Sequence, residues 1–232
     1  MRNILVLGAS SGIGYATAKL LSKDNNVIAI ARREERLKEF ENYEVFDFSA
    51  LDEIESFVKN VVKKYSKLDT LIYCGGIQNI KPLKVTKIQE AKEIFDINYF
   101  APMLFAKAFS SKRVSNINSS ILFISSIAAI KPEAGILNYS ASKAALSNLT
   151  VGLAKEIAPI RVNAISPGFI KTEMTEKFSH IYSDEFIKEI QKDYPLGLGN
   201  VENIADMAEF LISEKASYIT GDIIRVDGGG AL

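Results

Sequence analysis

The stretch ILVLGASSGIG, residues 4–14, joins a short apolar run to three glycines and opens into a segment with helical periodicity. Gly8, Gly12 and Gly14 allow a tight turn and let the backbone approach a bound group without interference from a Cβ atom. The N–H groups and the dipole at the start of the following helix attract negative charge. An ordinary glycine-rich turn is the alternative, but the position between a first strand and a first helix favours a loop that binds the diphosphate of a dinucleotide.

Short runs rich in β-branched residues alternate with helical segments along the rest of the chain. The expected strands are residues 4–7, 27–31, 44–48, 70–74, 121–125, 161–165 and 223–226, and the expected helices are residues 13–22, 50–65, 87–109, 142–157 and 204–213. Such alternation is typical of a parallel sheet covered on both faces, and right-handed crossovers favour a doubly wound topology. The sequence therefore predicts a three-layer α/β fold with a mostly parallel seven-stranded sheet. Without linkers or repeats, we expect one domain, residues 1–232.

The composition of the chain excludes several classes of protein. Its 232 residues are 47% apolar and 24% charged, which suits a globular chain long enough to bury a core without disulfides or a metal. The 28 Lys and Arg residues are balanced by 28 Asp and Glu residues and are scattered among them, so we expect no nucleic-acid partner. The only cysteine, Cys74, cannot form an internal disulfide, which favours a reducing compartment.

Targeting and membrane segments are not expected either. The richest apolar stretch, residues 121–130, contains two serines and falls short of the ~18 apolar residues that a membrane helix requires. The N-terminus loosely resembles a signal peptide, but its apolar run covers only residues 4–7 and ends at Gly8, whereas such signals need about 7 to 15 apolar residues. We therefore expect a cytoplasmic protein with no membrane partner.

Charge at the end of the second expected strand bears on the choice between the two nicotinamide dinucleotides. An acidic side chain at this position holds the ribose 2′-hydroxyl of NAD, whereas this chain has Arg32 and Arg33. A guanidinium binds a 2′-phosphate through two hydrogen bonds, so we expect NADP(H), with NAD(H) as the alternative cofactor. Arg32 is the first choice for this contact because it lies nearer the strand end. Alternatively, the two arginines are solvated and neutralised by Glu34 and Glu35.

Tyr139 and Lys143 stand four residues apart, which places them on the same face of a helix. A free tyrosine has a pKa of about 10, and a nearby positive charge stabilises the phenolate and lowers that value. The pair therefore predicts an acid–base group, although a tyrosine and a lysine at this spacing are common in helices. Ser125 and Ser126 end the fifth expected strand, where a hydroxyl can hold the oxygen of a carbonyl or an alcohol.

With these motifs the sequence resembles the short-chain dehydrogenase/reductase family from Asn3 to Gly229. The resemblance rests on the glycine spacing of residues 8–14, on the tyrosine–lysine pair and on the serine thirteen residues before the tyrosine. Residues 167–172, 218–221 and 226–229 resemble further family segments. The resemblance implies a Rossmann-type fold and an oxidoreductase that transfers a hydride between NADP(H) and a carbonyl or secondary alcohol. A 3-oxoacyl thioester of a carrier protein is the first expected small-molecule substrate, ahead of small ketones, sterols and sugars.

The resemblance also implies the site residues. The expected catalytic residues are Asn98, Ser126, Tyr139 and Lys143. In this interpretation Ser126, rather than Ser125, holds the substrate oxygen and Tyr139 exchanges the proton. Lys143 lowers the pKa of Tyr139 and binds the nicotinamide ribose, and Asn98 helps to hold a proton-relay water. The residues expected to hold the cofactor are Gly8, Ser10, Ser11, Gly12, Ile13, Gly14, Arg32, Arg33, Asp47, Phe48, Cys74, Gly75, Gly76, Tyr139, Lys143, Pro167, Gly168, Ile170 and Thr172.

Two positions depart from the family pattern and one role has an alternative. Leu7 stands where the family usually has threonine, and Tyr73-Cys74-Gly75-Gly76 replaces Asn-Asn-Ala-Gly after the fourth strand. Because an orphaned buried polar group costs ~1–3 kcal/mol, we expect apolar packing of Leu7 near Cys74 to replace the missing contact. Cys74 is then a buried strand residue rather than a nucleophile. Asp47, expected at the adenine, could instead cap the helix that begins near residue 50.

The region after the sixth strand is expected to cover the substrate. Residues 173–198 correspond to the mobile substrate lid of the family and include His180, the only histidine, which has no second ligand for a familiar metal site. We therefore expect no metal. Apolar residues flank the catalytic edge and suggest a cleft for an acyl chain or a ring, or else core and lid packing. These residues are Ile127, Ile130, Ile136, Leu137, Phe169, Met174 and Phe178.

The helix that follows Tyr139 is apolar or small nearly all round, which indicates burial within the domain or against a second subunit. Similar proteins assemble through this helix and the one before it, so we expect a homodimer or a homotetramer. Two other functions stay open. A non-catalytic nucleotide sensor or scaffold would lose the tyrosine or the lysine, and both are present. Enoyl reductases of the same superfamily separate these residues by six positions, so the spacing of four favours a carbonyl substrate.

Overall fold

In the computed structural model, which describes residues 1–178 and 181–232, seven strands form one parallel sheet in the order β3-β2-β1-β4-β5-β6-β7. The strands are β1 (Asn3–Leu7), β2 (Asn26–Ala31), β3 (Asn42–Val45), β4 (Leu68–Tyr73), β5 (Ser115–Ile124), β6 (Arg161–Pro167) and β7 (Ile223–Val226). The strand order reverses direction between β1 and β4, as in a doubly wound sheet. The predicted Rossmann-type topology is therefore confirmed.

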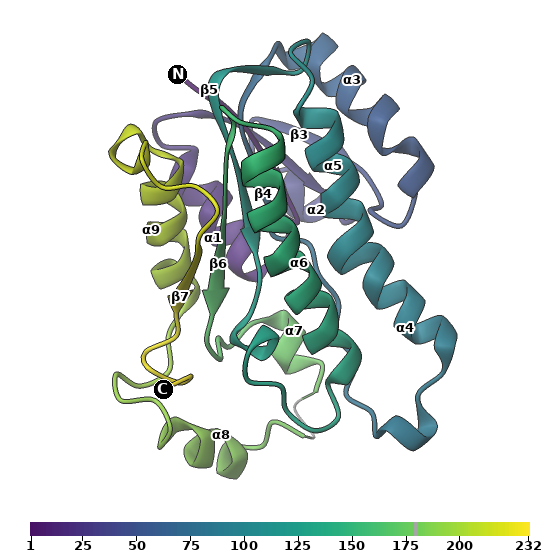
Figure 1. Cartoon of the computed structure of the whole chain (residues 1–232), viewed down its shortest axis with the longest axis vertical. Coiled ribbons are helices and arrows are strands. Elements are labelled where there is room, and N and C mark those ends of the chain that lie inside the picture. Colours follow the sequence, from purple (N-terminus) through teal and green to yellow (C-terminus); the bar gives the residue numbers. More distant parts are fainter. Residues whose placement is uncertain (179–180) are drawn as a thin grey trace.

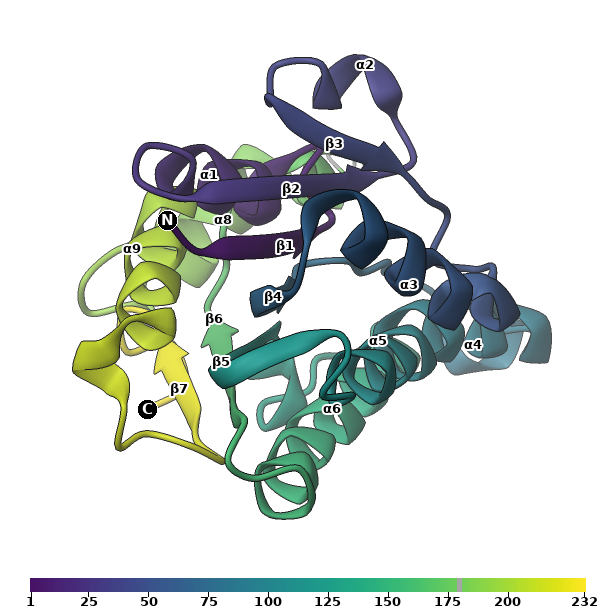
Figure 2. The ribbon, with the colours of Figure 1, turned by 90° about the horizontal axis from the view of Figure 1, so that it is seen from above.

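Helices cover both faces of this sheet. They are α1 (Gly12–Leu21), α2 (Glu34–Leu37), α3 (Ile54–Tyr65), α4 (Ile88–Phe95), α5 (Ala101–Phe109), α6 (Leu137–Glu156), α7 (Glu173–Glu176), α8 (Asp184–Gln191) and α9 (Val201–Ile212). Figure 2 shows α1 and α9 on one side of the sheet and α3, α5 and α6 on the other. The short helices α7 and α8 lie beyond one end of the sheet (Figure 1).

The central strands are buried on both faces, which explains their continuous apolar sequences. Leu5 and Leu7 of β1 belong to the core cluster that includes residues of α3 and α5. Ile4 and Val6, which alternate with them, belong to the cluster that includes residues of α1 and α9. Burial of each such side chain stabilises the fold by about 1.5–3 kcal/mol. None of the helices in the described parts of the chain combines the length and apolar character of a membrane span.

The packing between β1 and β4 differs from our expectation. Leu7 is in register with Tyr73, and both side chains lie in one core cluster, whereas Cys74 packs against the cluster on the opposite face. Because successive side chains of a strand point to opposite faces, the prediction that Leu7 packs near Cys74 is wrong. Tyr73 takes that place instead, and its hydroxyl donates a hydrogen bond of 2.7 Å to the main-chain oxygen of Ile97.

Several boundaries also differ from the predicted ones. The expected helix 87–109 contains a π-helical turn, Asp96–Phe100, between α4 and α5. The expected helix 142–157 begins earlier, at Leu137, so that α6 includes both Tyr139 and Lys143. The third strand ends at Val45 rather than at residue 48, because the chain leaves the edge of the sheet before it reaches the cleft.

Candidate active site

The carboxyl ends of the parallel strands border a cleft of about 1110 Å³. It lies at the reversal of strand order between β1 and β4, where doubly wound proteins bind their ligands. Its volume exceeds the ~300–1,000 Å³ of an ordinary small-molecule pocket, so it offers room for a dinucleotide and a substrate together. Every residue that we expected to hold the cofactor lines this cleft, as does Ser126.

The loop between β1 and α1 is shaped by close backbone approaches. Gly8 has a φ of 92°, and a Cβ atom there would lie 2.8 Å from the main-chain nitrogen of Gly75. A Cβ atom on Gly14 would lie 2.2 Å from the main-chain oxygen of Gly8. Ser11, the N-cap residue of α1, makes no side-chain capping bond, so the first-turn N–H groups remain available to an anion. This cradle fits the diphosphate of a dinucleotide.

The three central catalytic candidates come from the end of β5 and the first turns of α6. Ser126 begins a 3-10 turn, and its Oγ accepts a hydrogen bond of 3.1 Å from the Ala128 nitrogen. Tyr139 and Lys143 lie one turn apart in α6, with the Lys143 Nζ atom 5.8 Å from the centre of the Tyr139 ring. The fold therefore brings all three side chains to one end of the cleft.

Ser125 has a different environment from its neighbour Ser126. Its hydroxyl lies 2.7 Å from the Ser147 hydroxyl and donates a hydrogen bond of 3.1 Å to the main-chain oxygen of Lys143. It therefore holds the end of β5 against α6. Of the two serines, Ser126 is the one whose hydroxyl is not engaged with the backbone of α6.

Burial dominates the acid–base properties of this end of the cleft. Lys143 is only 4% exposed, and its Nζ donates a hydrogen bond of 2.7 Å to the main-chain oxygen of Ile124. Burial lowers the pKa of Lys143 to about 8, against the opposing influence of Cys74. Burial also raises the pKa of the Cys74 thiol to about 12, which suits a packing residue rather than a nucleophile.

The pKa of Tyr139 shifts opposite to our expectation. Burial raises it to about 12, a hydrogen bond with Ser126 works against that rise, and nearby Tyr182 adds to it. The predicted lowering by Lys143 is wrong for this structure because the ammonium is directed at Ile124 rather than at the phenol. Tyr139 therefore keeps its proton throughout the neutral range.

Asn98 lies in the π-helical turn and is the one catalytic candidate that does not line the cleft. Its Oδ1 accepts a hydrogen bond of 2.9 Å from the Ile77 nitrogen, and its Nδ2 donates bonds of 2.9 Å to the Ile77 oxygen and the Ser142 hydroxyl. Ser142 in turn donates a bond of 2.7 Å to the main-chain oxygen of Tyr139. Asn98 thus joins the loop after β4 to the catalytic turn of α6, and its role in holding a water stays a prediction.

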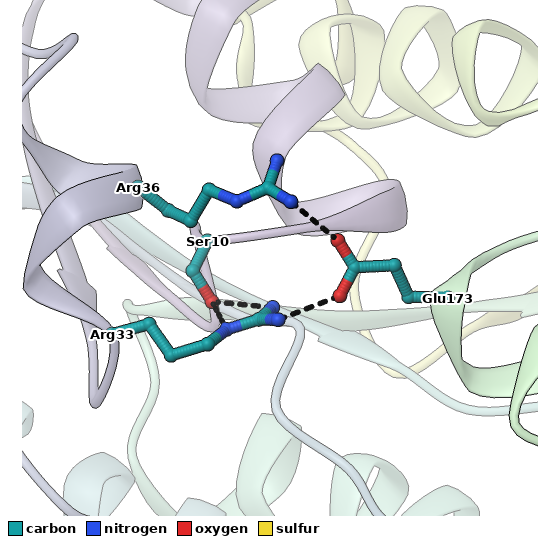
Figure 3. Close-up of polar contacts among 4 residues, drawn as sticks. All are labelled: Ser10, Arg33, Arg36 and Glu173. Atoms are coloured by element: carbon teal, nitrogen blue, oxygen red, sulfur yellow. Dashed lines mark hydrogen bonds and ion pairs between the residues drawn. The ribbon is translucent and has the colours of Figure 1, made fainter.

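The other end of the cleft is built from charged side chains (Figure 3). The Arg33 guanidinium donates to the Ser10 hydroxyl through Nε and Nη2, at 3.4 and 3.1 Å, and its Nη1 lies 2.7 Å from the carboxylate of Glu173. Arg36 lies 3.6 Å from the same carboxylate. Arg33, rather than our first choice Arg32, therefore reaches the glycine loop.

Arg32 has a separate partner, Asp47, at 3.7 Å. Asp47 also accepts hydrogen bonds of 3.0 and 2.9 Å from the nitrogen and hydroxyl of Ser49. Burial acts to raise the pKa of Asp47, but the Ser49 bonds and the Arg32 charge outweigh it and lower that pKa. The alternative of Asp47 as a helix cap is wrong, since α3 has Glu53 as its N-cap. The arginines pair with these partners rather than with Glu34 and Glu35.

Aromatic side chains that follow β6 in the sequence line the cleft. The Tyr182 ring lies 5.2, 6.4 and 5.5 Å from the rings of Phe169, Phe178 and Phe186, measured between centroids. Gln78 donates a hydrogen bond of 2.9 Å to the Tyr182 hydroxyl. Sequence reasoning missed Tyr182, which lies between α7 and α8 and so belongs to no helical pattern.

The predicted apolar lining is confirmed in part. Ile127, Ile136, Phe169, Met174 and Phe178 line the cleft. Ile130 and Leu137 do not line it, and these residues are 63% and 48% exposed to solvent. The lid prediction for His180 falls outside the described residues. Within the described residues, no three His, Cys, Asp or Glu side chains gather as a metal site requires.

A doubly wound sheet with a glycine cradle and a serine–tyrosine–lysine group in one cleft defines the class of short-chain dehydrogenase/reductases, and the chain belongs to this family. A family model described as Enoyl-(Acyl carrier protein) reductase matches residues 8–230. Among individual proteins, the chain is 37% identical to the 3-oxoacyl-[acyl-carrier-protein] reductase FabG of Rickettsia conorii, over 97% of this chain and 95% of that protein. The family resemblance seen in the sequence is confirmed.

Solved structures of the family share the fold. A 4-hydroxyisoleucine dehydrogenase complexed with NADH is similar with a TM-score of 0.89 and 31% identity, over 99% of this chain and 98% of that chain. An actinorhodin polyketide ketoreductase variant with NADPH is similar with a TM-score of 0.89 and 25% identity, over 99% and 97% of the two chains. One of these two similar structures contains NADH and the other contains NADPH. The choice between the cofactors therefore depends on side chains rather than on the fold.

Proposed function

We propose that this chain is an NADPH-dependent reductase of 3-oxoacyl thioesters, which it converts to 3-hydroxyacyl thioesters. The observation that carries the proposal is the meeting of Ser126, Tyr139 and Lys143 at one end of a cleft whose other end is a glycine cradle. The 3-oxoacyl-[acyl-carrier-protein] reductases among its relatives support this choice of substrate. The enoyl reductase description of the family model points to a different acyl substrate, which the experiment below includes.

Each side chain of the site has one proposed role in the reduction. The glycine loop and the residues around it would hold NADPH, which would supply a hydride to the carbonyl carbon. The Ser126 hydroxyl donates a hydrogen bond to the substrate oxygen, where negative charge develops. Tyr139, which is protonated at neutral pH, gives its proton to that oxygen. Lys143, buried one turn away with its Nζ bonded to the main-chain oxygen of Ile124, is the residue that would bind the nicotinamide ribose.

The cofactor preference follows from charge at the end of β2. Arg33 and Arg32 both line the cleft, and no carboxylate stands at the first position after the strand. Guanidinium groups bind a phosphate through paired hydrogen bonds, so NADP(H) is preferred and NAD(H) is the weaker alternative.

The remaining parts of the proposal concern the domain, the lid, the cellular location and the oligomeric state of the protein. We propose one domain with a substrate lid at residues 173–198, in a cytoplasmic homodimer or homotetramer. Exposed small residues along α6, among them Ala141 and Gly152, would permit a close approach of a second subunit. Light scattering on the purified protein measures the mass, and a monomer would contradict the oligomer.

The function is tested with the purified full-length chain. A 3-oxoacyl thioester and an enoyl thioester are each supplied with NADPH and with NADH, and oxidation of the cofactor is followed. We expect turnover of the 3-oxoacyl thioester with a preference for NADPH. Turnover of the enoyl thioester alone would replace the proposed substrate. Cofactor binding without turnover of either thioester or of a panel of ketones would favour a sensor or scaffold.

A further inference from the structure

Glu173 contacts two arginines from across the cleft, at the first residue of α7 (Figure 3). One carboxylate oxygen lies 2.7 Å from the Arg33 Nη1 atom and the other lies 3.6 Å from the Arg36 Nη2 atom. The remaining two nitrogens of Arg33 contact the Ser10 hydroxyl. All three nitrogens of the Arg33 guanidinium therefore have an acceptor, and the carboxylate is shared between two guanidinium groups.

The Arg33 nitrogens that contact Ser10 and Glu173 are also the ones that would bind a phosphate of the cofactor. Ser10 belongs to the glycine loop and Arg33 follows β2, the two elements that border the adenosine ribose in a doubly wound fold. Guanidinium groups bind carboxylates and phosphates with the same paired geometry. A 2′-phosphate at this ribose would meet the carboxylate of Glu173 on the same arginine. A ribose with a free 2′-hydroxyl carries no charge and does not compete with Glu173 for Arg33.

We propose that Glu173 is an internal competitor of the cofactor 2′-phosphate and thereby limits the preference of the chain for NADP(H) over NAD(H). Glu173 is a specificity-determining residue in this proposal, which rests on the proposed use of a nicotinamide dinucleotide. The hydrogen bond from Arg33 lowers the pKa of Glu173, so the competitor is charged at neutral pH. Because residue 173 also begins the proposed lid, the phosphate and the lid compete for one contact.

The expected effect is moderate because the contact is partly open to solvent. The side chains of Arg33, Arg36 and Glu173 are 47%, 58% and 33% exposed. Exposed ion pairs contribute little each, and two pairs on one carboxylate correspond to a change of about three- to tenfold in a dissociation constant.

The experiment isolates the 2′-phosphate from the rest of the cofactor. Adenosine 2′,5′-bisphosphate and ADP are titrated calorimetrically into the full-length chain, into Glu173→Gln and into the matched control Glu176→Gln. Glu176 is exposed on the same short helix, so its replacement removes the same charge from α7. We expect Glu173→Gln to bind the 2′,5′-bisphosphate about three- to tenfold more tightly and ADP within about twofold of the unchanged chain. Glu176→Gln should change neither value.

A second variant shows whether the effect passes through the arginine. In an Arg33→Gln background, Glu173→Gln should lose most of its effect on the 2′,5′-bisphosphate. Unchanged or weaker binding by Glu173→Gln overturns the proposal, since the carboxylate would then be neutral or would hold Arg33 in its binding position. If NADPH binds the unchanged chain normally in that case, only this inference fails. If the unchanged chain binds neither NADPH nor NADH, the proposed function fails with it.

Discussion

The two ends of the cleft are built on different physical principles. At the catalytic end, Lys143 is 4% exposed and hydrogen-bonds to the backbone at Ile124. At the adenosine end, Arg33 is 47% exposed and pairs with Glu173, a side chain 140 residues away in the sequence. The first end contains a buried lysine that is bonded to the backbone, whereas the second end is held by charges that water can solvate.

This difference predicts how each end responds to substitution. A buried polar group that loses its partner costs about 1–3 kcal/mol, whereas an exposed ion pair is worth about 0–1 kcal/mol. Substitutions at the catalytic end should therefore have large effects on activity or stability that neighbouring residues do not compensate. Changes at the adenosine end should be small and should adjust specificity.

The largest effect is expected for Tyr139→Phe. The substitution removes the only proton donor proposed for the substrate oxygen, and general acid catalysis contributes about 10²–10⁴-fold to a rate. We expect kcat for the 3-oxoacyl thioester to fall by that factor while the dissociation constant for NADPH stays within about twofold. Tyr15→Phe is the control, because Tyr15 hydrogen-bonds to Glu39 on the surface. A Tyr139→Phe enzyme with normal turnover would remove the assigned role.

The catalytic end could be predicted from sequence because its information is local. Tyr139 and Lys143 are separated by one helical turn, so their proximity follows from helix geometry alone. The central strands could be predicted because burial on both faces makes them continuously apolar. The contact of Glu173 with Arg33 had no such signal, since it joins two exposed charges from distant segments. Periodicity reports burial, and neither residue is buried.

The error at β1 shows a second limit of sequence reasoning. The register pairs Leu7 with Tyr73, and Cys74 is the next residue along the chain. A displacement of one residue moves a side chain to the other face of a sheet, so an approximate alignment of two strands cannot tell which neighbour packs. Asn98 marks a break in the helical pattern of residues 87–109, and the structure has the π-helical turn Asp96–Phe100 at this break.

The next largest effect concerns the support of the catalytic turn. Asn98→Ala would leave the Ile77 N–H group, the Ile77 oxygen and one side of the Ser142 hydroxyl without their present partner. We expect the free energy of unfolding, measured by urea denaturation, to fall by about 3 kcal/mol. Ser142→Ala removes fewer of these bonds and should cost about 1 kcal/mol. Equal costs for the two variants would contradict the assignment of Asn98 as the main connection.

The pH dependence of stability gives a smaller effect at the same end. Lys143 loses its proton near pH 8 in the folded protein, because burial lowers its pKa to about 8, and near its ordinary value of about 10.5 when unfolded. Between these values the unfolded chain binds more protons, so stability rises with pH. From about pH 8 to 9.5 we expect Lys143 to add about 2 kcal/mol to the free energy of unfolding, while Cys74, whose pKa burial raises to about 12, offsets part of this rise because its thiol ionises in the unfolded chain.

The control for this prediction is Lys143→Met, which has no proton to release at this position. Relative to the unchanged chain, its free energy of unfolding should fall by about 2 kcal/mol over the same pH range, since both proteins keep Cys74. A parallel rise in both proteins would assign the effect to other groups. The high pKa of Tyr139 acts only above its unfolded value of about 10, where it would oppose the trend, so the measurement stays below that pH.

The smallest effect, and the one that sharpens the comparison most, is expected at the adenosine end. Arg33→Gln removes a guanidinium that contacts the glycine loop at Ser10, and we expect NADP⁺ to bind about tenfold more weakly while NAD⁺ changes by less than about twofold. Arg32→Gln is the matched variant. Its side chain is 64% exposed and pairs with Asp47 at 3.7 Å, so its loss should weaken NADP⁺ binding by only about two- to threefold.

Calorimetric titration with each of the two cofactors distinguishes the two variants. A larger effect for Arg32→Gln would place the 2′-phosphate on the Asp47 side of β2, and Glu173 would then be too remote to compete with it.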